Sequence, residues 1–173
     1  SDRLYRYTEQ GTNHILKVDY TFNEDNNLTK RVVNFWGSDR VSQMTYDTDN
    51  RLSSLTLGSH KQSYAYDEYG RLSTVTRSNS GSTFLTNRYS YLTNSSGGQT
   101  GQIGSFTVDG ASYDVTFSYT YDDNGNILTA SDGTHTSSYV YDTANQLIRE
   151  NNQAAGKTWV WTYDNGGNIT IFA

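Results

Sequence analysis

The sequence of 173 residues contains no cysteine, no proline and a single methionine. Without cysteine the chain cannot hold a disulfide scaffold, a Cys-ligated zinc site, an iron–sulfur cluster or a thiol nucleophile. No stretch approaches the roughly 18 consecutive apolar residues of a membrane-spanning helix, and the first residues do not resemble a signal peptide. The net charge is −5 with scattered acids, which argues against a nucleic-acid partner.

Aromatic residues are unusually frequent, at 14% of the chain with 15 tyrosines. Threonine and asparagine are also common, whereas alanine and leucine, which favour helices, are few. Disordered chains are poor in aromatic residues and carry a high net charge, so disorder does not fit. The composition predicts an all-β protein whose core is built from tyrosine.

A seven-residue segment recurs along the chain, about 20 to 30 residues apart. Position 1 is Tyr, position 2 Asp, position 5 Gly or Asn, and position 7 Leu or Ile. Position 1 falls at Tyr46, Tyr66, Tyr121, Tyr141, Tyr163 and, with similar residues around it, Phe22. The consensus residues are Tyr46, Asp47, Tyr66, Asp67, Gly70, Tyr121, Asp122, Gly125, Tyr141, Asp142, Tyr163, Asp164 and Gly167. Tyr91 is predicted to anchor a seventh copy, with Leu92 in place of the Asp.

Each copy has the features of a β-hairpin. A second large apolar residue stands two positions before the anchor, so two rings share one face of a strand. Asp then ends the strand by accepting backbone N–H groups, and Gly or Asn at position 5 supplies the positive φ of a tight turn. Because a lone hairpin is marginally stable, the sequence predicts tandem antiparallel hairpins in one curved or spiralling sheet. We expect residues 1–173 to form a single array of about seven repeats.

Two connections differ from this pattern. Residues 93–102 are rich in Ser, Gly and Asn and are predicted to form a flexible loop. Asp109-Gly110 lies between two strand-like segments and is a strong hairpin signal.

The repeated segment resembles the YD repeat, also called the Rhs repeat, over about residues 20–169. That family includes bacterial Rhs and wall-associated proteins, the C component of insecticidal toxin complexes, and teneurins. The resemblance implies a non-catalytic strip of sheet that spirals into a hollow shell. The resemblance also implies that the shell encloses a C-terminal toxic domain or serves adhesion, in a secreted or cell-surface bacterial protein. The partner implied is the remainder of the same chain, with toxin cargo or a cell-surface glycan as further partners.

Toxin-bearing members of the family close the shell with an Asp-Pro-x-Gly motif where the cargo is released. A chain without proline cannot carry that motif, so no cleavage residue is assigned here. Asp2-Arg3-Leu4 resembles the middle of a preceding repeat, and Ile169-Thr170-Ile171 the first half of a returning strand. We therefore expect an excerpt of a larger array, truncated at both ends.

The sequence offers weak signals for chemistry. The acidic segments 47–50 and 122–126 lack the spacing of a calcium loop and are interpreted as turns. His14, His60 and His135 stand far apart, and no nucleophile motif occurs. We expect no catalytic residue, no metal and no cofactor.

An alternative function is carbohydrate binding by exposed aromatic rings. The candidates are Trp36, Trp159 and Trp161. Trp159 and Trp161 are in phase with the repeated aromatic doublet, which favours a packing role, whereas Trp36 lies between repeats. Unpaired strands at the ends of the array also predict an edge-to-edge homodimer.

Overall fold

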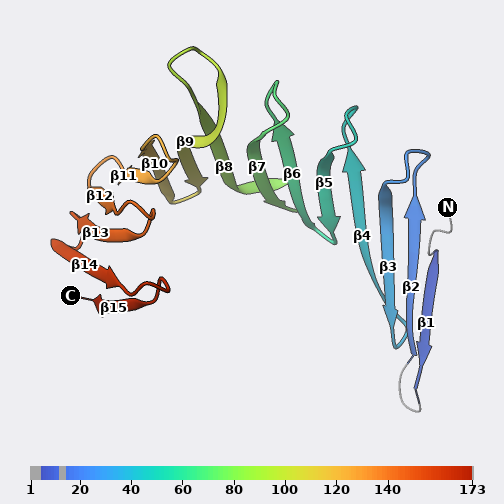
Figure 1. Cartoon of the computed structure of the whole chain (residues 1–173). Coiled ribbons are helices and arrows are strands. Elements are labelled where there is room, and N and C mark those ends of the chain that lie inside the picture. The colour runs from blue at the N-terminus through green and yellow to red at the C-terminus, as the bar shows by residue number, and fades with distance from the viewer. Residues whose placement is uncertain (1–4, 12–14, 173) are drawn as a thin grey trace. The chain divides into compact units, whose positions relative to one another are not determined.

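The computed structural model describes residues 5–11 and 15–172. The described residues form strands, turns and loops without any helix, so no described helix could cross a membrane. His14 and the segment 2–4 lie outside the described residues. The strands are β1 (Arg6–Gln10), β2 (Ile15–Phe22), β3 (Leu28–Phe35), β4 (Ser38–Tyr46), β5 (Leu52–Leu57), β6 (His60–Tyr66), β7 (Leu72–Asn79), β8 (Ser82–Thr93), β9 (Gln99–Gly110), β10 (Tyr113–Tyr121), β11 (Ile127–Ser131), β12 (Thr136–Tyr141), β13 (Leu147–Asn152), β14 (Lys157–Tyr163) and β15 (Ile169–Phe172) (Figure 1).

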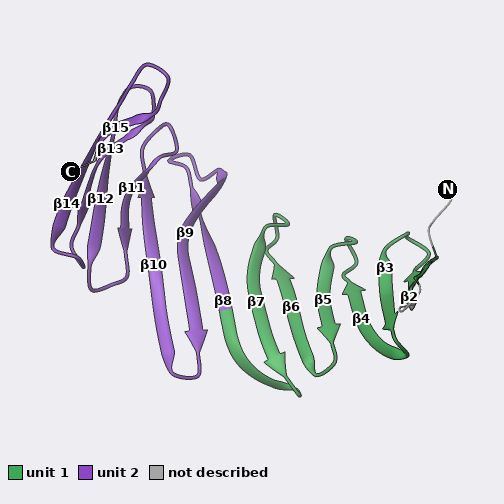
Figure 2. Ribbon diagram, turned by 90° about the horizontal axis from the view of Figure 1, so that it is seen from below, with its two compact units in different colours: residues 1–86 green, residues 87–173 purple. Residues whose placement is uncertain are grey.

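The chain divides into two compact units, unit 1 (residues 1–86) and unit 2 (residues 87–173), with the boundary inside β8 (Figure 2). Within unit 1, strands β1 to β7 pair antiparallel in chain order. Within unit 2, strands β9 to β15 do the same. The predicted all-β fold of tandem antiparallel hairpins is therefore confirmed. That the whole chain is one array stays a prediction.

Two kinds of connection alternate along the strands. The first kind, the repeat turns, span residues 23–27, 47–51, 67–71, 94–98, 122–126, 142–146 and 164–168. The second kind, the hairpin tips, span residues 36–37, 58–59, 80–81, 111–112, 132–135 and 153–156. Because the strands are antiparallel, repeat turns lie at one end of the strands of a unit and hairpin tips at the other.

The residue at position 5 has positive φ in every repeat turn, as the sequence predicts. Asn50 has φ 60°, Gly70 78° and Asn145 61°. The remaining four values belong to Asn26, Gly97, Gly125 and Gly167. Gly and Asn adopt this left-handed conformation at the lowest cost, so the choice at position 5 follows from backbone sterics.

A β-bulge directly precedes the anchor in each of the six clear copies. Thr45 pairs with Ser54, but Tyr46 pairs with Leu52, so Ser53 has no opposite residue. The same register shift occurs before Phe22, Tyr66, Tyr121, Tyr141 and Tyr163. Bulges bend a strand and increase its twist. The sequence pattern of simple alternation after position 7 missed this extra residue.

The aromatic doublets share one face of the sheet, which we call the aromatic face. In β14, Trp159, Trp161 and Tyr163 are half-buried, whereas Val160 between them is exposed. Among the described residues, only Val18, Val75 and Ser54 are buried, with 5%, 4% and 6% of their surface still exposed. The core is therefore thin, because within each unit one layer of sheet carries the packing.

The structure corrects two turn positions. The chain turns at 94–98, so Asn94 takes position 2 and the anchor at Tyr91 was placed two residues too early. Gln99 onward belongs to β9, and the predicted flexibility of residues 93–102 stays a prediction. Asp109 and Gly110 lie in β9, paired with Asp114 and Tyr113, and the hairpin turns at residues 111–112 instead.

Candidate functional site

The carboxylate at position 2 organises each repeat turn. Asp47 Oδ1 accepts the backbone N–H of Asp49 at 3.0 Å and of Arg51 at 2.9 Å. The Asp47 carbonyl accepts the N–H of Asn50 at 3.1 Å, and the Asp47 N–H donates to the Arg51 carbonyl at 2.9 Å. One acid thus satisfies most of the polar backbone of its turn, in an Asx-type arrangement.

The same arrangement recurs at the other consensus acids. Asp67, Asp122, Asp142 and Asp164 each accept the N–H groups of positions 4 and 6. Asn94 does so with its amide oxygen, through the N–H groups of Ser96 and Gly98. An uncharged acceptor at position 2 is therefore sufficient for the geometry of the turn. For this reason the Tyr-Asp pattern does not identify the turn that Asn94 begins.

The side chain at position 6 binds the second carboxylate oxygen. Arg51 Nε lies 2.8 Å from Asp47 Oδ2, and Arg71 Nε lies 2.7 Å from Asp67 Oδ2. Asn126 Nδ2 donates to Asp122 Oδ2 at 2.9 Å. In the Arg repeats the turn therefore contains a short ion pair, and in the Asn repeats a neutral donor replaces it.

These contacts lower the pKa of four turn acids, Asp47, Asp67, Asp122 and Asp164. At Asp67, burial opposes ionisation, but the hydrogen bond from Arg71 and the backbone N–H donors outweigh it and lower the pKa. At Asp122 and Asp164 the amide of the position 6 asparagine is the main cause of a lowered pKa. Hydrogen bonds to the charged form favour that form, so the turn acids are held ionised.

The anchor tyrosine links each hairpin to the preceding one. Its hydroxyl donates to the backbone carbonyl of an apolar residue in the returning strand of the previous repeat. For Tyr66 the acceptor is Leu52 at 2.9 Å, and for Tyr141 it is Ile127 at 3.0 Å. The other such bonds join Tyr46 to Leu28, Tyr121 to Ile103 and Tyr163 to Leu147. The tyrosine thus packs by its ring and pairs by its hydroxyl.

A further contact, the cross-turn pair, joins position 6 of one repeat to position 5 of the next. Asn27 Nδ2 donates to Asn50 Oδ1 at 2.9 Å, and Asn126 Nδ2 donates to Asn145 Oδ1 at 2.8 Å. Where position 5 is glycine, a longer side chain lies over it. A Cβ built on Gly70 would stand 3.3 Å from Arg51 Nη1.

Gln146 and Gly167 form the second pair of this long-over-glycine kind, with Gln146 Nε2 3.3 Å from a Cβ built on Gly167. Asparagine is therefore paired with asparagine, and a long side chain with glycine, in these four junctions. Position 6 of one repeat and position 5 of the next lie about 20 residues apart in the sequence, so the sequence alone does not indicate that they pair.

The carboxylates at position 2 of the repeat turns therefore have a structural role, because each is hydrogen-bonded to the backbone of its own turn. No group of three or more His, Asp and Glu side chains among the described residues is arranged to hold a metal ion. The acidic segments 47–50 and 122–126 are both repeat turns.

Trp36 stands out among the hairpin tips. It has φ 52°, a left-handed conformation unusual for a bulky residue, and it is 68% exposed. Its ring stacks on that of Phe35, with centroids 5.1 Å apart and planes 10° from parallel. Trp36 belongs to unit 1, whereas Trp159 and Trp161 lie half-buried in unit 2 on the aromatic face.

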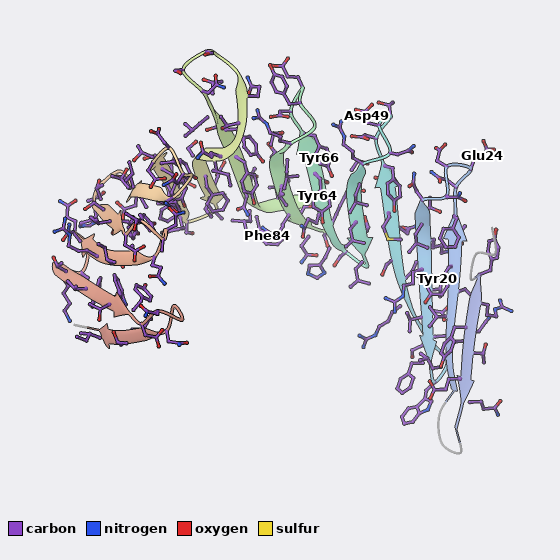
Figure 3. The ribbon with its side chains drawn as sticks, in the orientation of Figure 1. Tyr20, Glu24, Asp49, Tyr64, Tyr66 and Phe84 are labelled. Carbon is purple, nitrogen blue, oxygen red and sulfur yellow. The ribbon has the colours of Figure 1, made fainter. Side chains whose placement is uncertain are left out.

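An open groove lies on unit 1 between β5 and β8, toward the hairpin tips. Its volume is about 200 Å³, and its lining includes Leu55, Leu57, His60, Gln62, Arg77 and Phe84. Leu55 pairs with Gln62, and Gln62 with Arg77, so these three side chains form one row across adjacent strands. In Figure 3, Phe84 lies toward the hairpin tips and Tyr66 toward the repeat turns. The sequence alone gave no signal for this groove, because its residues are scattered over four strands.

Comparison with family models gives a match over one part of the chain. Residues 46–83 match the family model described as RHS Repeat. No curated protein sequence matches the chain. The match covers the turns of Asp47 and Asp67, and it confirms the resemblance given by the repeated segment.

Two solved structures are similar in fold. A crystal structure of TcdB2-TccC3 without its hypervariable C-terminal region aligns with 91% of this chain at 19% identity and a TM-score of 0.68. This chain spans only 9% of that one. A porin-like protein from Bacteroides uniformis aligns over 95% of this chain and 84% of its own at 14% identity. Its TM-score of 0.44 is too low to bear on the fold.

Proposed function

Since this chain carries RHS repeats, we propose that it is a non-catalytic wall segment of a much longer RHS-repeat protein. In this proposal the segment contributes to a β-shell that encloses or displays a toxin or adhesive domain. Its partners are the remainder of its own chain and a C-terminal cargo. The fold shared with TcdB2-TccC3 over 91% of this chain, but 9% of that one, supports a role as one part of a longer wall.

The observation that carries the proposal is the hydrogen bond from each anchor tyrosine to the preceding hairpin. At Tyr66 and Tyr141 the hydroxyl is engaged by a backbone carbonyl at 2.9 and 3.0 Å. The turn acids bind backbone N–H groups of their own turns, and the tyrosine hydroxyls bind the preceding hairpin. The repeated residues thus hold neighbouring hairpins in register. A scaffold needs such links, whereas a catalytic site needs acids and hydroxyls free to meet a substrate.

Protease protection in the full parent protein tests the enclosing role. We expect the cargo domain to resist digestion in the intact protein and to be cut rapidly when produced alone. The double variant Tyr66→Ala, Tyr141→Ala removes two links and is expected to expose the cargo, whereas Glu68→Ala is the matched control. Cargo that is digested equally fast in both contexts would contradict enclosure.

Secretion or display at the cell surface is part of the same proposal and is supported by the family resemblance. Surface proteolysis of intact producing cells should remove the protein if it is displayed, with a cytoplasmic protein as control. Protection until lysis would contradict display.

Edge-to-edge pairing of two copies is a separate proposal. Among the described residues β15 is paired on one side only, and Ile169 and Ile171 are 58% and 56% exposed. An open strand of this kind can pair with another chain. Sedimentation of the 173-residue chain should show a dimer that Ile171→Lys weakens, and a clean monomer at high concentration would contradict it.

Carbohydrate binding is the second candidate function, and Trp36 is the observation that favours it. An exposed indole stacked on Phe35 offers a flat apolar surface of the kind that sugar rings pack against. Titration with a glycan panel, followed by tryptophan fluorescence, should give a saturable change that Trp36→Ala removes. Trp159→Ala is the comparison, and a panel without any saturable response would eliminate this function.

A further inference from the structure

The groove of unit 1 combines apolar side chains with an unpaired cation. Leu57 is 52% exposed, Phe84 48% and Leu55 36%, so the apolar surface is open to solvent. Arg77 lines the same groove, and its guanidinium makes no hydrogen bond or ion pair with any described residue. By contrast, the arginines at position 6 of the repeat turns, Arg51 and Arg71, are paired with acids of their own turns. Arg77 is therefore available to a ligand.

The charge around the groove is of one sign. No Asp or Glu occurs from residue 50 to 66 or from residue 69 to 108, although the whole chain has a net charge of −5. Lys61 stands in the same cross-strand row as Lys30, Gln43 and Thr56, on the opposite face, so Arg77 carries the charge of the groove. A cation without neighbouring acids, on a chain of negative net charge, attracts an anionic partner and repels a cationic one.

The size of the groove restricts the occupant. Its volume of about 200 Å³ is below the roughly 300 to 1,000 Å³ of pockets that hold a drug-sized ligand or cofactor. One large apolar side chain fits this space, with neighbouring carboxylates placed to meet Arg77. The row of Leu55, Gln62 and Arg77 runs across three adjacent strands, so Gln62 separates an apolar end from a cationic end by two strand spacings.

We propose that this groove binds an extended acidic peptide in which a leucine-type or phenylalanine-type side chain is flanked by Glu or Asp. The apolar side chain packs between Leu55, Leu57 and Phe84. A flanking carboxylate forms a bidentate pair with the Arg77 guanidinium, which suits the geometry of both groups. Scaffolding does not require this property, so it goes beyond the function proposed above.

Fluorescence anisotropy on the complete 173-residue chain tests the groove. The probe is a rhodamine-labelled peptide of alternating leucine and glutamate. Two matched peptides replace every glutamate by lysine or every leucine by serine. We expect saturable binding of the first peptide alone, weakened by added salt because charge contributes.

Variants locate the binding. Arg77→Gln should weaken it about tenfold, since a charge-assisted hydrogen bond is lost, and Arg77→Lys should retain most of it. Phe84→Ser should weaken it roughly five- to tenfold through lost apolar contact. Lys30→Gln is the matched control, because it removes one positive charge from an exposed site on the opposite face.

Leu57→Ser guards against misfolding of the Phe84 variant, since Leu57 is already half-exposed. Equal binding of the lysine peptide, or equal losses in Arg77→Gln and Lys30→Gln, would overturn the proposal. A chain that dimerises through the groove, with dimerisation abolished by Phe84→Ser and no peptide bound, would overturn it as well.

Discussion

Repeat turns and hairpin tips close the same strands at opposite ends, but they are built in different ways. The repeat turns all have five residues, the same backbone hydrogen bonds and a left-handed residue at position 5. The hairpin tips have two to four residues and no common hydrogen-bond pattern. Large aromatic side chains in or next to the tips, such as Trp36 and Tyr113, are 68% and 64% exposed.

The difference indicates that the two ends of the strands have different roles, one structural and one open to recognition. The repeat turns fix the spacing of hairpins, because the turn acid, the anchor tyrosine and the cross-turn pair each engage backbone or a neighbouring repeat. The hairpin tips share no repeated set of links, although the Ser80 N–H donates to the Ser59 carbonyl of the neighbouring tip at 2.9 Å, so their sequences are freer to carry recognition. Both Trp36 and the groove near Leu57 and Phe84 lie toward the tips.

Acidification should have the largest effect, because it acts on several repeat turns at once. Asp47, Asp67, Asp122 and Asp164 have a folded-state pKa below the usual value of 3.8. Their ionisation therefore stabilises the fold above about pH 4, and this contribution is lost as the pH falls through the lower folded-state pKa values. Melting temperatures measured from pH 6 to pH 2 should fall mainly below pH 4.

The variant Asp67→Asn, Asp122→Asn should flatten that pH dependence, because Asn94 shows that an amide oxygen can accept the same N–H groups. Asp132, at a hairpin tip, also has a lowered pKa through the N–H groups of His135 and Thr134. Asp132→Asn is thus the matched tip variant. If Asp132→Asn reduced the pH dependence of the melting temperature more than the double turn variant, the repeat turns would not be the main source of that dependence.

Removal of an anchor ring should have the largest effect of any single substitution. Tyr66→Ala deletes a half-buried ring, its hydrogen bond to Leu52 and its contact with the Arg51 guanidinium, 4.6 Å from the ring centre. We expect a loss of about 2 to 3 kcal/mol in urea denaturation followed by circular dichroism. Tyr66→Phe, which removes the hydroxyl alone, should lose about 1 kcal/mol.

Tyr113, exposed at the start of β10 directly after a hairpin tip, is the matched aromatic control. Tyr113→Ala should change stability by less than about 0.5 kcal/mol. Similar losses of unfolding free energy at Tyr66 and Tyr113 would show that both ends of the strands contribute equally to stability.

The cross-turn pair should appear as a coupling of smaller size. Asn126→Gln and Asn145→Gly each break an Asn–Asn pair, whereas the double variant recreates the long-over-glycine arrangement seen at Gln146 and Gly167. We expect the double variant to be more stable than the sum of the single effects by about 0.5 to 1 kcal/mol. Additive effects would mean that neighbouring turns do not select each other.

A swap of left-handed residues should give effects of opposite sign at the two kinds of turn. Trp36→Asn places a residue that tolerates φ 52° at the tip, and we expect a gain of about 0.5 to 1 kcal/mol. Asn50→Trp, at φ 60° in a repeat turn, should instead cost about 1 kcal/mol or more, since it also loses the bond from Asn27. Thermal denaturation of both variants checks the signs, and a loss in Trp36→Asn would show that the indole stabilises its own tip.

Much of the fold could be predicted because one short segment encodes one hairpin. The aromatic doublet defines a face, Asp ends a strand, and Gly or Asn at position 5 meets a backbone requirement that few residues satisfy. These are local rules, so a single sequence contains them. Where a residue departs from the consensus but keeps the chemistry, as Asn94 does, pattern matching placed the turn two residues early.

The features that were missed depend on neighbours across the sheet. The bulge before each anchor follows from the register between strands, as with Ser53 opposite no residue. The cross-turn pairs and the groove unite residues from different hairpins, such as Leu55 and Arg77. No local sequence pattern predicts the bulges, the cross-turn pairs or the groove, because each residue involved is typical of its own strand or turn.

The in-order pairing of strands within each unit has a consequence for folding kinetics. Every described partner of β2 to β6 is the strand directly before or after it in the chain. Short separations close with little loss of loop entropy, so folding is fast for contacts of this kind. Hairpins can thus form one after another as a nascent or translocating chain emerges, each using the last completed strand as its template. Unfolding under force should proceed from a free end in the reverse order.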